Sequence, residues 1–236
     1  AYHLMRVMRA WPGEEVIVFD GSGAEWLATV TRLERSTVEL RLLDRREVDR
    51  ELPFELTLMV ALPKGDRQRW LAEKAVELGV SGLVPLATER GVAQPVEKAL
   101  ARLRRTVIEA SKQCGRNRLM SIAAPLAAAE AFSAPRVDGA LRALLDPSGR
   151  QSLQALLAAG GAGKPRSICF AIGPEGGFSG DELRLAASNQ WPVVHLGPRI
   201  LRVETAALCA AAGAQMLGCD SLCSGPEGLA ETPSIK

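Results

Sequence analysis

The feature that most constrains the fold is a repeated alternation of short apolar segments with helical stretches, which begins at Leu56. The apolar segments are "LTLMVALP", "GLVPLAT", "ALLD", "ICFAIG" and "VVHLG". The stretches with helical periodicity are residues 67–78, 98–112, 152–159 and 180–190. Strands that are apolar throughout are typical of sheets buried on both faces. The pattern therefore predicts an α/β domain in which helices cover both faces of a largely parallel sheet.

The residues before Glu51 have a different pattern of apolar and polar side chains. Short alternating segments, "EEVIVFDG", "AEWLATVTRLE" and "STVELRLLD", are separated by Gly and Ser turns, which is typical of a small antiparallel barrel. We therefore divide the chain into a barrel (1–52), an α/β domain (53–220) and a flexible tail (221–236), since no periodicity follows Gly218. The chain starts with alanine inside a pattern, so we expect the first barrel strand to be missing.

Charge placement, rather than overall charge, bears on nucleic-acid binding. The chain has 29 basic and 27 acidic residues, a net charge of +2, which argues against a histone-like or tail-driven binder. The segment 98–118 is strongly basic, and Glu109 is its only acidic residue. Its basic residues are Lys98, Arg102, Arg104, Arg105, Lys112, Arg116 and Arg118. This cluster predicts either an RNA-binding surface or an ordinary solvated helix face.

The cysteines and the hydropathy pattern indicate a soluble cytoplasmic protein. The five cysteines, at positions 114, 169, 209, 219 and 223, are odd in number and lack CxxC or Cys/His spacing, so we expect reduced thiols and no metal. No uncharged apolar run is long enough to cross a membrane, and the N-terminus lacks the apolar centre of a signal peptide.

Two junctions between a strand and a helix carry most of the specialised residues. In "AIGPEGGFSGDEL", residues 171–183, glycines allow close approach of a ligand, and Ser179 with Glu182 forms a capping box that starts a helix. In "LGPRILRVETAALCAAAG", residues 196–213, a loop leads into an alanine-rich helix. Because specialised residues are concentrated at these two junctions, we expect the backbone groups of the two loops to bind a ligand.

A phosphate-binding loop is the first alternative for this site. The chain contains neither GxxxxGK[ST] nor GxGxxG, and the nearest string, "GGAGKPRS", has the wrong spacing. Glu175 would also repel a phosphate, so we expect an uncharged or cationic ligand.

The pair "IGPEGGFSGDEL" and "LGPRILRVETAAL" resembles the ribosomal RNA small subunit methyltransferase E family. Similarity extends to "HLMRVMR", "VFDGSG", "KGDRQRWLAEKAVELGV", "ATERGV" and "EASKQCGRNR". The resemblance implies a PUA-like RNA-binding barrel followed by a SPOUT domain with a trefoil knot, which binds S-adenosylmethionine. It also implies a homodimer that methylates N3 of a uridine in 16S rRNA, the family target m3U1498, with the 30S subunit as the expected form of the substrate.

The resemblance also implies a cofactor site, in which the two loops hold adenine through backbone groups and Ile200 and Leu201 form apolar walls. The expected cofactor-binding residues are Leu145, Ile172, Gly173, Gly176, Leu196, Gly197, Ile200, Leu201 and Thr205. The small residues of the last helix, Ala206, Ala207, Ala210, Ala211, Gly213 and Ala214, would let it pass close to the loops.

Methylation at N3 requires loss of a proton before the nitrogen attacks the sulfonium methyl, so stabilising the uracil anion is the main task. We expect Arg202 to be the stabilising cation, with an ion pair to Glu204 or Glu175 as its structural alternative. Glu175 and Glu204 are themselves either proton acceptors or, as we favour, loop anchors. We expect Cys114 to be a packed thiol, and His195 a strand-end residue.

The expected RNA contacts are cations and one amide along several segments, because Lys and Arg supply most sequence-independent affinity. They are Arg6, Arg9, Lys64, Arg67, Arg90, Lys112, Gln113 and Arg116. Two other functions stay open, namely a non-catalytic RNA-binding protein and a SPOUT methyltransferase that acts on another RNA or position. The absence of a SpoU-type opening motif weighs against the second.

Overall fold

The computed structural model describes residues 10–34, 37–91, 97–159 and 165–222, with side chains up to residue 218. The chain folds as two compact units that divide between Arg50 and Glu51. Of the predicted flexible tail, residues 221 and 222 continue the last helix, and the rest lies outside the described residues.

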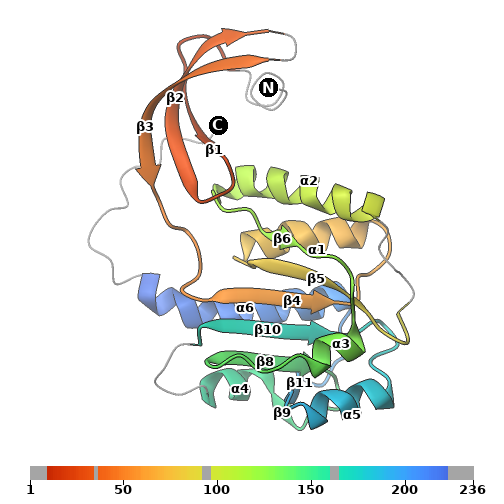
Figure 1. Cartoon of the computed structure of the whole chain (residues 1–236). Coiled ribbons are helices and arrows are strands. Elements are labelled where there is room, and N and C mark those ends of the chain that lie inside the picture. The colour runs from red at the N-terminus through yellow and green to blue at the C-terminus, as the bar shows by residue number, and fades with distance from the viewer. Residues whose placement is uncertain (1–9, 35–36, 92–96, 160–164, 223–236) are drawn as a thin grey trace. The chain divides into compact units, whose positions relative to one another are not determined.

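The N-terminal unit contains a three-stranded antiparallel sheet (Figure 1). Its strands are β1 (Glu15–Phe19), β2 (Ala24–Leu33) and β3 (Val38–Glu47), in the order β1-β2-β3. Alternation places Val16, Ala28 and Val30 in a small core, as expected for strands with one solvated face. The described strands agree with the predicted antiparallel organisation of this region.

The C-terminal unit alternates strands and helices along the chain. Its strands are β4 (Glu55–Val60), β5 (Gly82–Ala87), β6 (Ser121–Ile122), β7 (Leu126–Ala127), β8 (Ala140–Leu145), β9 (Gln151–Ser152), β10 (Ser167–Ile172) and β11 (Val193–His195). Its helices are α1 (Asp66–Glu77), α2 (Glu97–Cys114), α3 (Ala128–Ser133), α4 (Leu153–Ala159), α5 (Gly180–Ser188) and α6 (Val203–Leu222). The five predicted strands and four predicted helices are all present. The short elements β6, β7, β9 and α3 were not predicted.

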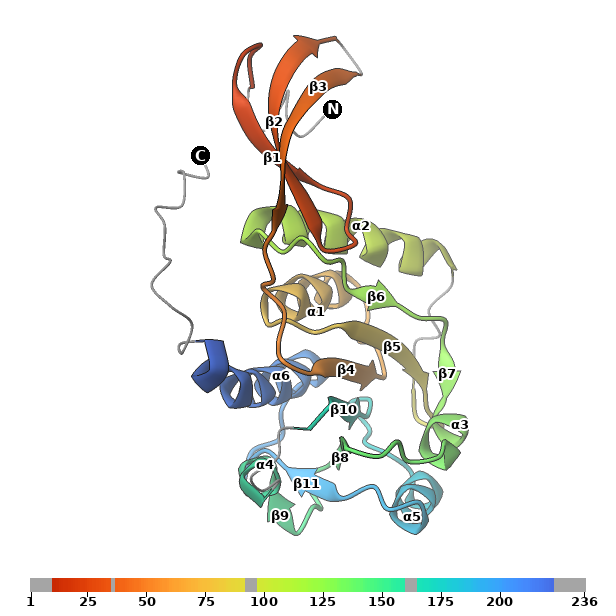
Figure 2. The same cartoon turned by 60° about the vertical axis from the view of Figure 1, so that its left-hand side comes forward.

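The strands of this unit form one parallel sheet with the order β6-β5-β4-β10-β8-β11-β9, and β7 extends β5. Figure 2 shows helices on both sides of it. One core lies between the sheet and helices α1, α2, α4 and α6, and a second core, which includes Phe132, Phe178 and Trp191, lies under α3 and α5. The predicted α/β class, with a parallel sheet covered on both faces, is confirmed.

Helix α6 packs against β4, β10, α1 and α4 through its small side chains. Ala207, Ala210, Ala211 and Ala214 are all fully buried. A methyl group is small enough to let the helix backbone lie close to the strands, so the alanine-rich sequence follows from tight packing. This helix begins directly after the loop 196–202.

The loop between β8 and β9 passes very close to β11. A Cβ added to Gly149 would lie 2.6 Å from the carbonyl carbon of Val194 and 2.8 Å from the backbone nitrogen of His195. Only glycine fits such an approach of two backbones. The loop is therefore held against the strand, and its first residue, Asp146, donates its N–H to the Val194 carbonyl at 3.0 Å.

Candidate active site

A cavity of about 280 Å³ lies where β10, β8 and β11 end. These three strands are neighbours in the sheet, and Leu145 and Ile172 are the last residues of β8 and β10, while Leu196 follows β11. The carboxyl ends of parallel strands, where connecting loops diverge, are the usual place for a ligand in an open α/β sheet. The cavity therefore occupies the edge at which this fold class binds ligands.

Eight of the nine predicted cofactor-binding residues line this cavity. They are Leu145, Ile172, Gly173, Gly176, Leu196, Gly197, Ile200 and Leu201. The ninth, Thr205, is the third residue of α6 and is exposed. It is not among the lining residues, whereas its neighbours Val203 and Ala206 are. The two loops singled out in the sequence thus lie on the same cavity.

The loop after β10 is tightened by a turn and by a distant arginine. Gly177 has a φ of +68° and donates its N–H to the Pro174 carbonyl at 2.8 Å. The guanidinium of Arg90 donates to the carbonyl of Gly176 at 3.0 Å. Arg90, predicted as a phosphate contact, therefore holds the cavity loop in place.

The helix that follows this loop begins with the predicted capping box. Ser179 accepts a hydrogen bond from the Glu182 N–H at 3.2 Å, and Glu182 accepts one from the Ser179 N–H at 2.8 Å. The second carboxylate oxygen of Glu182 accepts the backbone N–H of Glu89 at 2.9 Å. The buried Glu182 carboxylate thus accepts hydrogen bonds from two backbone N–H groups, one at the start of the helix and one in the loop that contains Glu89.

The loop after β11 has a second glycine in a left-handed conformation. Gly197 has a φ of +111°, and its N–H donates to Nδ1 of His195 at 3.1 Å. This places His195 at the end of a strand, as expected, where it supports the turn. Ile200 lines the cavity and is 79% exposed.

Glu175 and Glu204 share one cation at the cavity, and that cation is Arg67. Its guanidinium lies 3.3 Å from Oε1 of Glu175 and 3.7 Å from Oε2 of Glu204. The Glu204 side chain is almost fully buried, and its Oε2 has no hydrogen-bond partner among the described residues. A buried carboxylate requires a nearby positive charge, so Arg67 stabilises the start of α6 and the loop after β10 together.

Arg202, the predicted catalytic cation, is exposed at the end of the loop after β11. Within the described part of the chain, neither Glu175 nor Glu204 pairs with it, and both form their ion pair with Arg67 instead. The loop-anchoring ion pair that was the alternative role for Arg202 is therefore absent from the structure. Arg202 is not among the residues that line the cavity, whereas its neighbours Leu201 and Val203 are.

Asp146 lines the cavity and was missed by the sequence analysis. It follows β8, the strand between β10 and β11, so it lies between the two loops. Its Oδ1 accepts hydrogen bonds from the Ser148 N–H at 2.9 Å and the Ser148 hydroxyl at 2.6 Å. The string "DPSG" marks a turn, and only the strand order shows that the turn borders a cavity.

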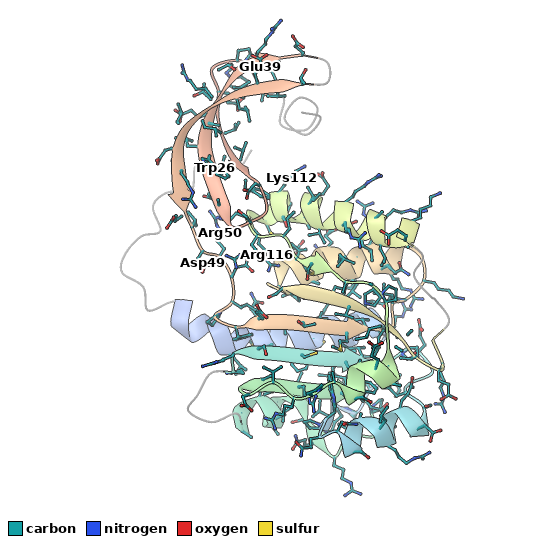
Figure 3. All side chains as sticks on the ribbon, viewed as in Figure 1. Trp26, Glu39, Asp49, Arg50, Lys112 and Arg116 are labelled. Carbon is teal, nitrogen blue, oxygen red and sulfur yellow. The ribbon has the colours of Figure 1, made fainter. Side chains whose placement is uncertain are left out.

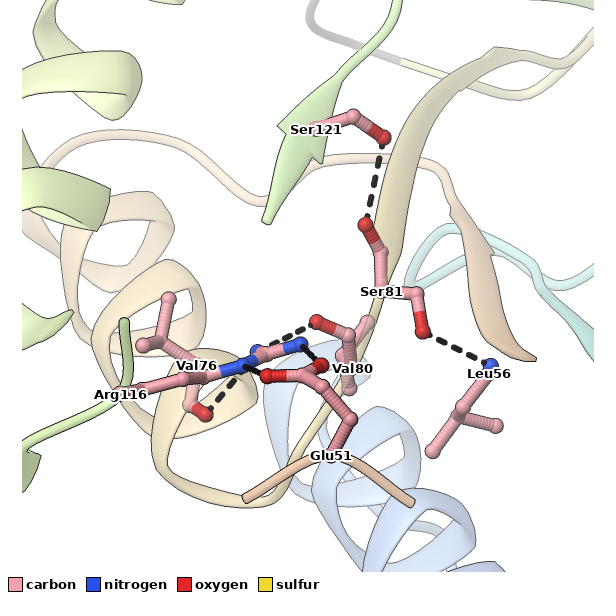
Figure 4. Close-up of polar contacts among 7 residues, drawn as sticks. All are labelled: Glu51, Leu56, Val76, Val80, Ser81, Arg116 and Ser121. Carbon is pink, nitrogen blue, oxygen red and sulfur yellow. Dashed lines mark hydrogen bonds and ion pairs between the residues drawn. The ribbon is translucent and has the colours of Figure 1, made fainter. Parts of the chain in front are cut away.

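Arg116 is not an RNA contact, because it is a buried structural residue. It is 4% exposed, and its guanidinium donates to both carboxylate oxygens of Glu51, at 2.8 and 2.5 Å. It also donates to the carbonyls of Val76, at 3.2 Å, and Val80, at 2.7 Å (Figure 4). This arginine joins the end of α1 to the segment that leads into β4, and the prediction for it was wrong.

The other predicted RNA contacts have varied surroundings. Lys64 and Gln113 are exposed, whereas Lys112, labelled with Arg116 in Figure 3, forms an ion pair with Glu109 at 2.9 Å. Lys98, Arg102 and Arg105 are exposed on α2. Arg6 and Arg9 lie outside the described residues.

No group of His, Cys, Asp and Glu side chains suited to a metal ion is found in the described ranges. Burial raises the pKa of the Cys169 thiol to about 12, so this thiol stays protonated near neutral pH. Cys114, expected to be packed, is exposed. Among the described helices, none is both long and apolar enough to cross a membrane.

Comparisons with known proteins identify the family. A family model described as an RNA methyltransferase domain matches residues 50–215, and one described as an RNA methyltransferase PUA domain matches residues 1–43. The ribosomal RNA small subunit methyltransferase E of Synechocystis sp. is 35% identical over 205 residues, which cover 87% of this chain and 67% of that protein. Its counterpart in Mycobacterium bovis is 31% identical over 215 residues, covering 89% and 80%.

Solved structures agree with this assignment. A ribosomal RNA small subunit methyltransferase E from Neisseria gonorrhoeae, bound to S-adenosyl methionine, is 33% identical with a TM-score of 0.81, over 91% of this chain and 88% of that one. A methyltransferase from Legionella pneumophila, in complex with the same cofactor, is 31% identical with a TM-score of 0.80, over 92% and 88%.

The fold, the cavity and the family models together define an RNA methyltransferase with an α/β domain and an N-terminal PUA domain. Within that class, the chain belongs to the ribosomal RNA small subunit methyltransferase E family. The resemblance drawn from the two loop motifs is confirmed.

Proposed function

We propose that this protein transfers a methyl group from S-adenosylmethionine to N3 of a uridine in 16S rRNA, at the family target m3U1498. The observation that carries the proposal is the cavity between the two motif loops, which eight of nine predicted residues line. The names of the relatives support rRNA of the small subunit as the substrate, and two related structures contain the cofactor.

The lining of the cavity fits S-adenosylmethionine. Leu145, Ile172, Leu196 and Leu201 offer apolar surface to an adenine ring, while the glycine-containing loops bring backbone N–H and C=O groups to its edges. The charged lining residues are Asp146, Glu175 and Arg199, which suits a ligand that carries charges of both signs, in its sulfonium, ammonium and carboxylate groups. When bound, the cofactor supplies the electrophilic methyl group.

The chain's own residues must then assist loss of the N3 proton and stabilise the anion that remains. Arg202 is the proposed stabilising cation: it is exposed, it lies between the lining residues Leu201 and Val203, and neither Glu175 nor Glu204 pairs with it. Glu175 and Glu204, both held by Arg67, stay the candidates for proton acceptor or loop anchor. Their shared ion pair favours the anchoring role.

The proposed RNA surface of the catalytic domain is the basic side of α2. It consists of the exposed Lys98, Arg102 and Arg105 and the half-buried Lys112, with Gln113 near the end of the helix and Lys64 before α1. Cations on a helix face bind phosphates without sequence preference and so orient the substrate. The base itself must be unstacked to expose N3. Arg6 and Arg9 remain proposed contacts from the PUA domain.

The trefoil knot, the homodimer, the 30S particle as substrate and the cytoplasmic location also belong to the proposal. They follow from the family and from the location of ribosomes. The close approach of Gly149 to the backbone of β11 supports a tightly wrapped chain in the region where the knot is expected.

The test uses the purified full chain with 30S subunits from a strain that lacks the family's enzyme. Incubation with S-adenosylmethionine, nuclease digestion and mass spectrometry of nucleosides should detect 3-methyluridine, at a single site when RNA fragments are mapped. Arg202→Ala should reduce the product strongly, whereas Arg184→Ala, an exposed change on α5, should not. A 2′-O-methylated or differently placed product would indicate another methyltransferase, and no cofactor binding would indicate a non-catalytic RNA-binding protein.

A further inference from the structure

Asp146 lines the cavity, and only one of its four polar atoms, Oδ2, has no protein partner among the described residues. Its N–H donates to the Val194 carbonyl at 3.0 Å, and its own carbonyl accepts the Gly149 N–H at 3.0 Å. Oδ1 accepts two hydrogen bonds from Ser148. Within the described ranges no donor binds Oδ2. Three of the four polar atoms therefore fix the residue, and the fourth is left for a ligand.

Oδ2 lies close to the loop that follows β10. A Cβ added to Gly177 would lie 3.8 Å from Oδ2, so this oxygen lies beside the left-handed glycine of the loop after β10. Asp146 and Gly177 both line the cavity. The carboxylate thus lies at the end of β8, the central strand of the three, and beside the loop after β10.

We propose that Asp146 is a cofactor-binding residue whose Oδ2 accepts a hydrogen bond from S-adenosylmethionine, from either a ribose hydroxyl or the ammonium group of its methionine part. A carboxylate accepts hydrogen bonds but cannot donate them, so it selects a donor-bearing group. The proposal rests on the proposed function, because it takes the methyl donor as the occupant of the cavity.

The arrangement favours binding because the acceptor is already in place. A side chain whose backbone and first carboxylate oxygen are held by Val194, Gly149 and Ser148 loses little freedom when a ligand arrives. A hydrogen bond to a charged acceptor contributes more than one between neutral groups. Removing it should weaken cofactor binding by about tenfold to a hundredfold.

The variants separate ligand binding from support of the loop. Asp146→Asn retains an oxygen that can accept from Ser148 but replaces Oδ2 with an NH₂ group, which repels a donor. Asp146→Ala removes both functions. Ser148→Ala is the matched control, because it removes the 2.6 Å hydrogen bond to Oδ1 and leaves Oδ2 unchanged.

Calorimetry with S-adenosylhomocysteine and with methylthioadenosine measures binding of the purified full chain, and thermal unfolding without ligand measures the fold. We expect Asp146→Asn to bind S-adenosylhomocysteine at least tenfold more weakly than the wild type, with an unfolding midpoint close to that of Ser148→Ala. An equal loss for methylthioadenosine places the donor on the ribose. A loss for S-adenosylhomocysteine alone places it on the ammonium group.

Unchanged affinity of Asp146→Asn and Asp146→Ala for both ligands would overturn the inference. So would a loss of affinity that Ser148→Ala reproduces, because the residue would then act only through the loop. Failure of the wild-type protein to bind either ligand would instead contradict the proposed function, so the two failures are distinguishable.

Discussion

Replacing Arg116 with leucine should destabilise the catalytic domain and leave RNA binding unchanged in the folded protein. Arg116 is 4% exposed, and its guanidinium makes four hydrogen bonds, two to the Glu51 carboxylate and two to the carbonyls of Val76 and Val80. Leucine fills part of the volume but offers no donor to any of these oxygens. The change removes the cation from a carboxylate whose side chain is 13% exposed.

Breaking a buried ion pair from one side costs about 3–5 kcal/mol. Some water can reach the Glu51 carboxylate, so we expect a loss of about 3 kcal/mol in the free energy of unfolding. For a domain of this size, that corresponds to a decrease in Tm of roughly 6–12 °C. The double variant Glu51→Leu/Arg116→Leu should lose less than Arg116→Leu alone, because it leaves no buried carboxylate without its cation.

Urea unfolding followed by circular dichroism measures the loss, with Arg118→Leu as the control. Arg118 lies two residues further on and is exposed, so its replacement removes the same charge with little effect on stability. A decrease of less than about 1 kcal/mol for Arg116→Leu would refute the structural role. Weaker RNA binding by a variant with unchanged stability would instead restore Arg116 to the RNA surface.

Further changes test other parts of the site. Arg202→Ala should lower single-turnover rates by about a hundredfold with little change in calorimetric cofactor affinity, and higher pH should partly restore the rate because hydroxide assists deprotonation; parallel losses of affinity and rate would exclude this role. Gly149→Ala should destabilise the fold by about 1–3 kcal/mol in urea unfolding, since its Cβ would meet backbone atoms of β11, and an unchanged midpoint would contradict the close approach. Cys169, with its raised pKa of about 12, should resist alkylation at pH 8 until the protein is denatured, as followed by mass spectrometry. The triple variant Lys98→Ala, Arg102→Ala and Arg105→Ala on α2 should bind RNA more weakly. The slope of log binding constant against log salt concentration should become shallower by roughly 0.7–0.9 for each lost phosphate contact, whereas an unchanged slope would identify a solvated helix face.

Local patterns in the sequence were sufficient for the main elements of the fold. Continuous apolar segments predicted β4, β5, β8, β10 and β11, because a strand buried on both faces has no solvated position for a polar side chain. The Ser179 and Glu182 capping box was also predicted, since both partners lie within one helical turn. The short helix α3 was missed because six residues give too little periodicity.

The cofactor cavity was predicted through its loops, and Thr205 shows the limit of that approach. The two motifs identified eight lining residues because each motif is continuous in the sequence. Thr205 belongs to the second motif but lies on α6, where rotation about the helix axis turns successive residues to different sides. Its exposure depends on how the helix packs, which the motif does not encode.

By itself the sequence determined the α/β class, the principal strands and helices, the two loops and the family, because each depends on residues that are close together in the chain. Only the tertiary structure decided which charges are buried and paired. Arg116 meets Glu51 across 65 residues, and Arg90 meets Gly176 across 86, so no local pattern distinguishes these cations from solvated ones. Asp146 gained its place in the cavity from the order of the strands. The physical reason is that a charged side chain's role is set by the partners and solvent around it, which long-range folding brings together.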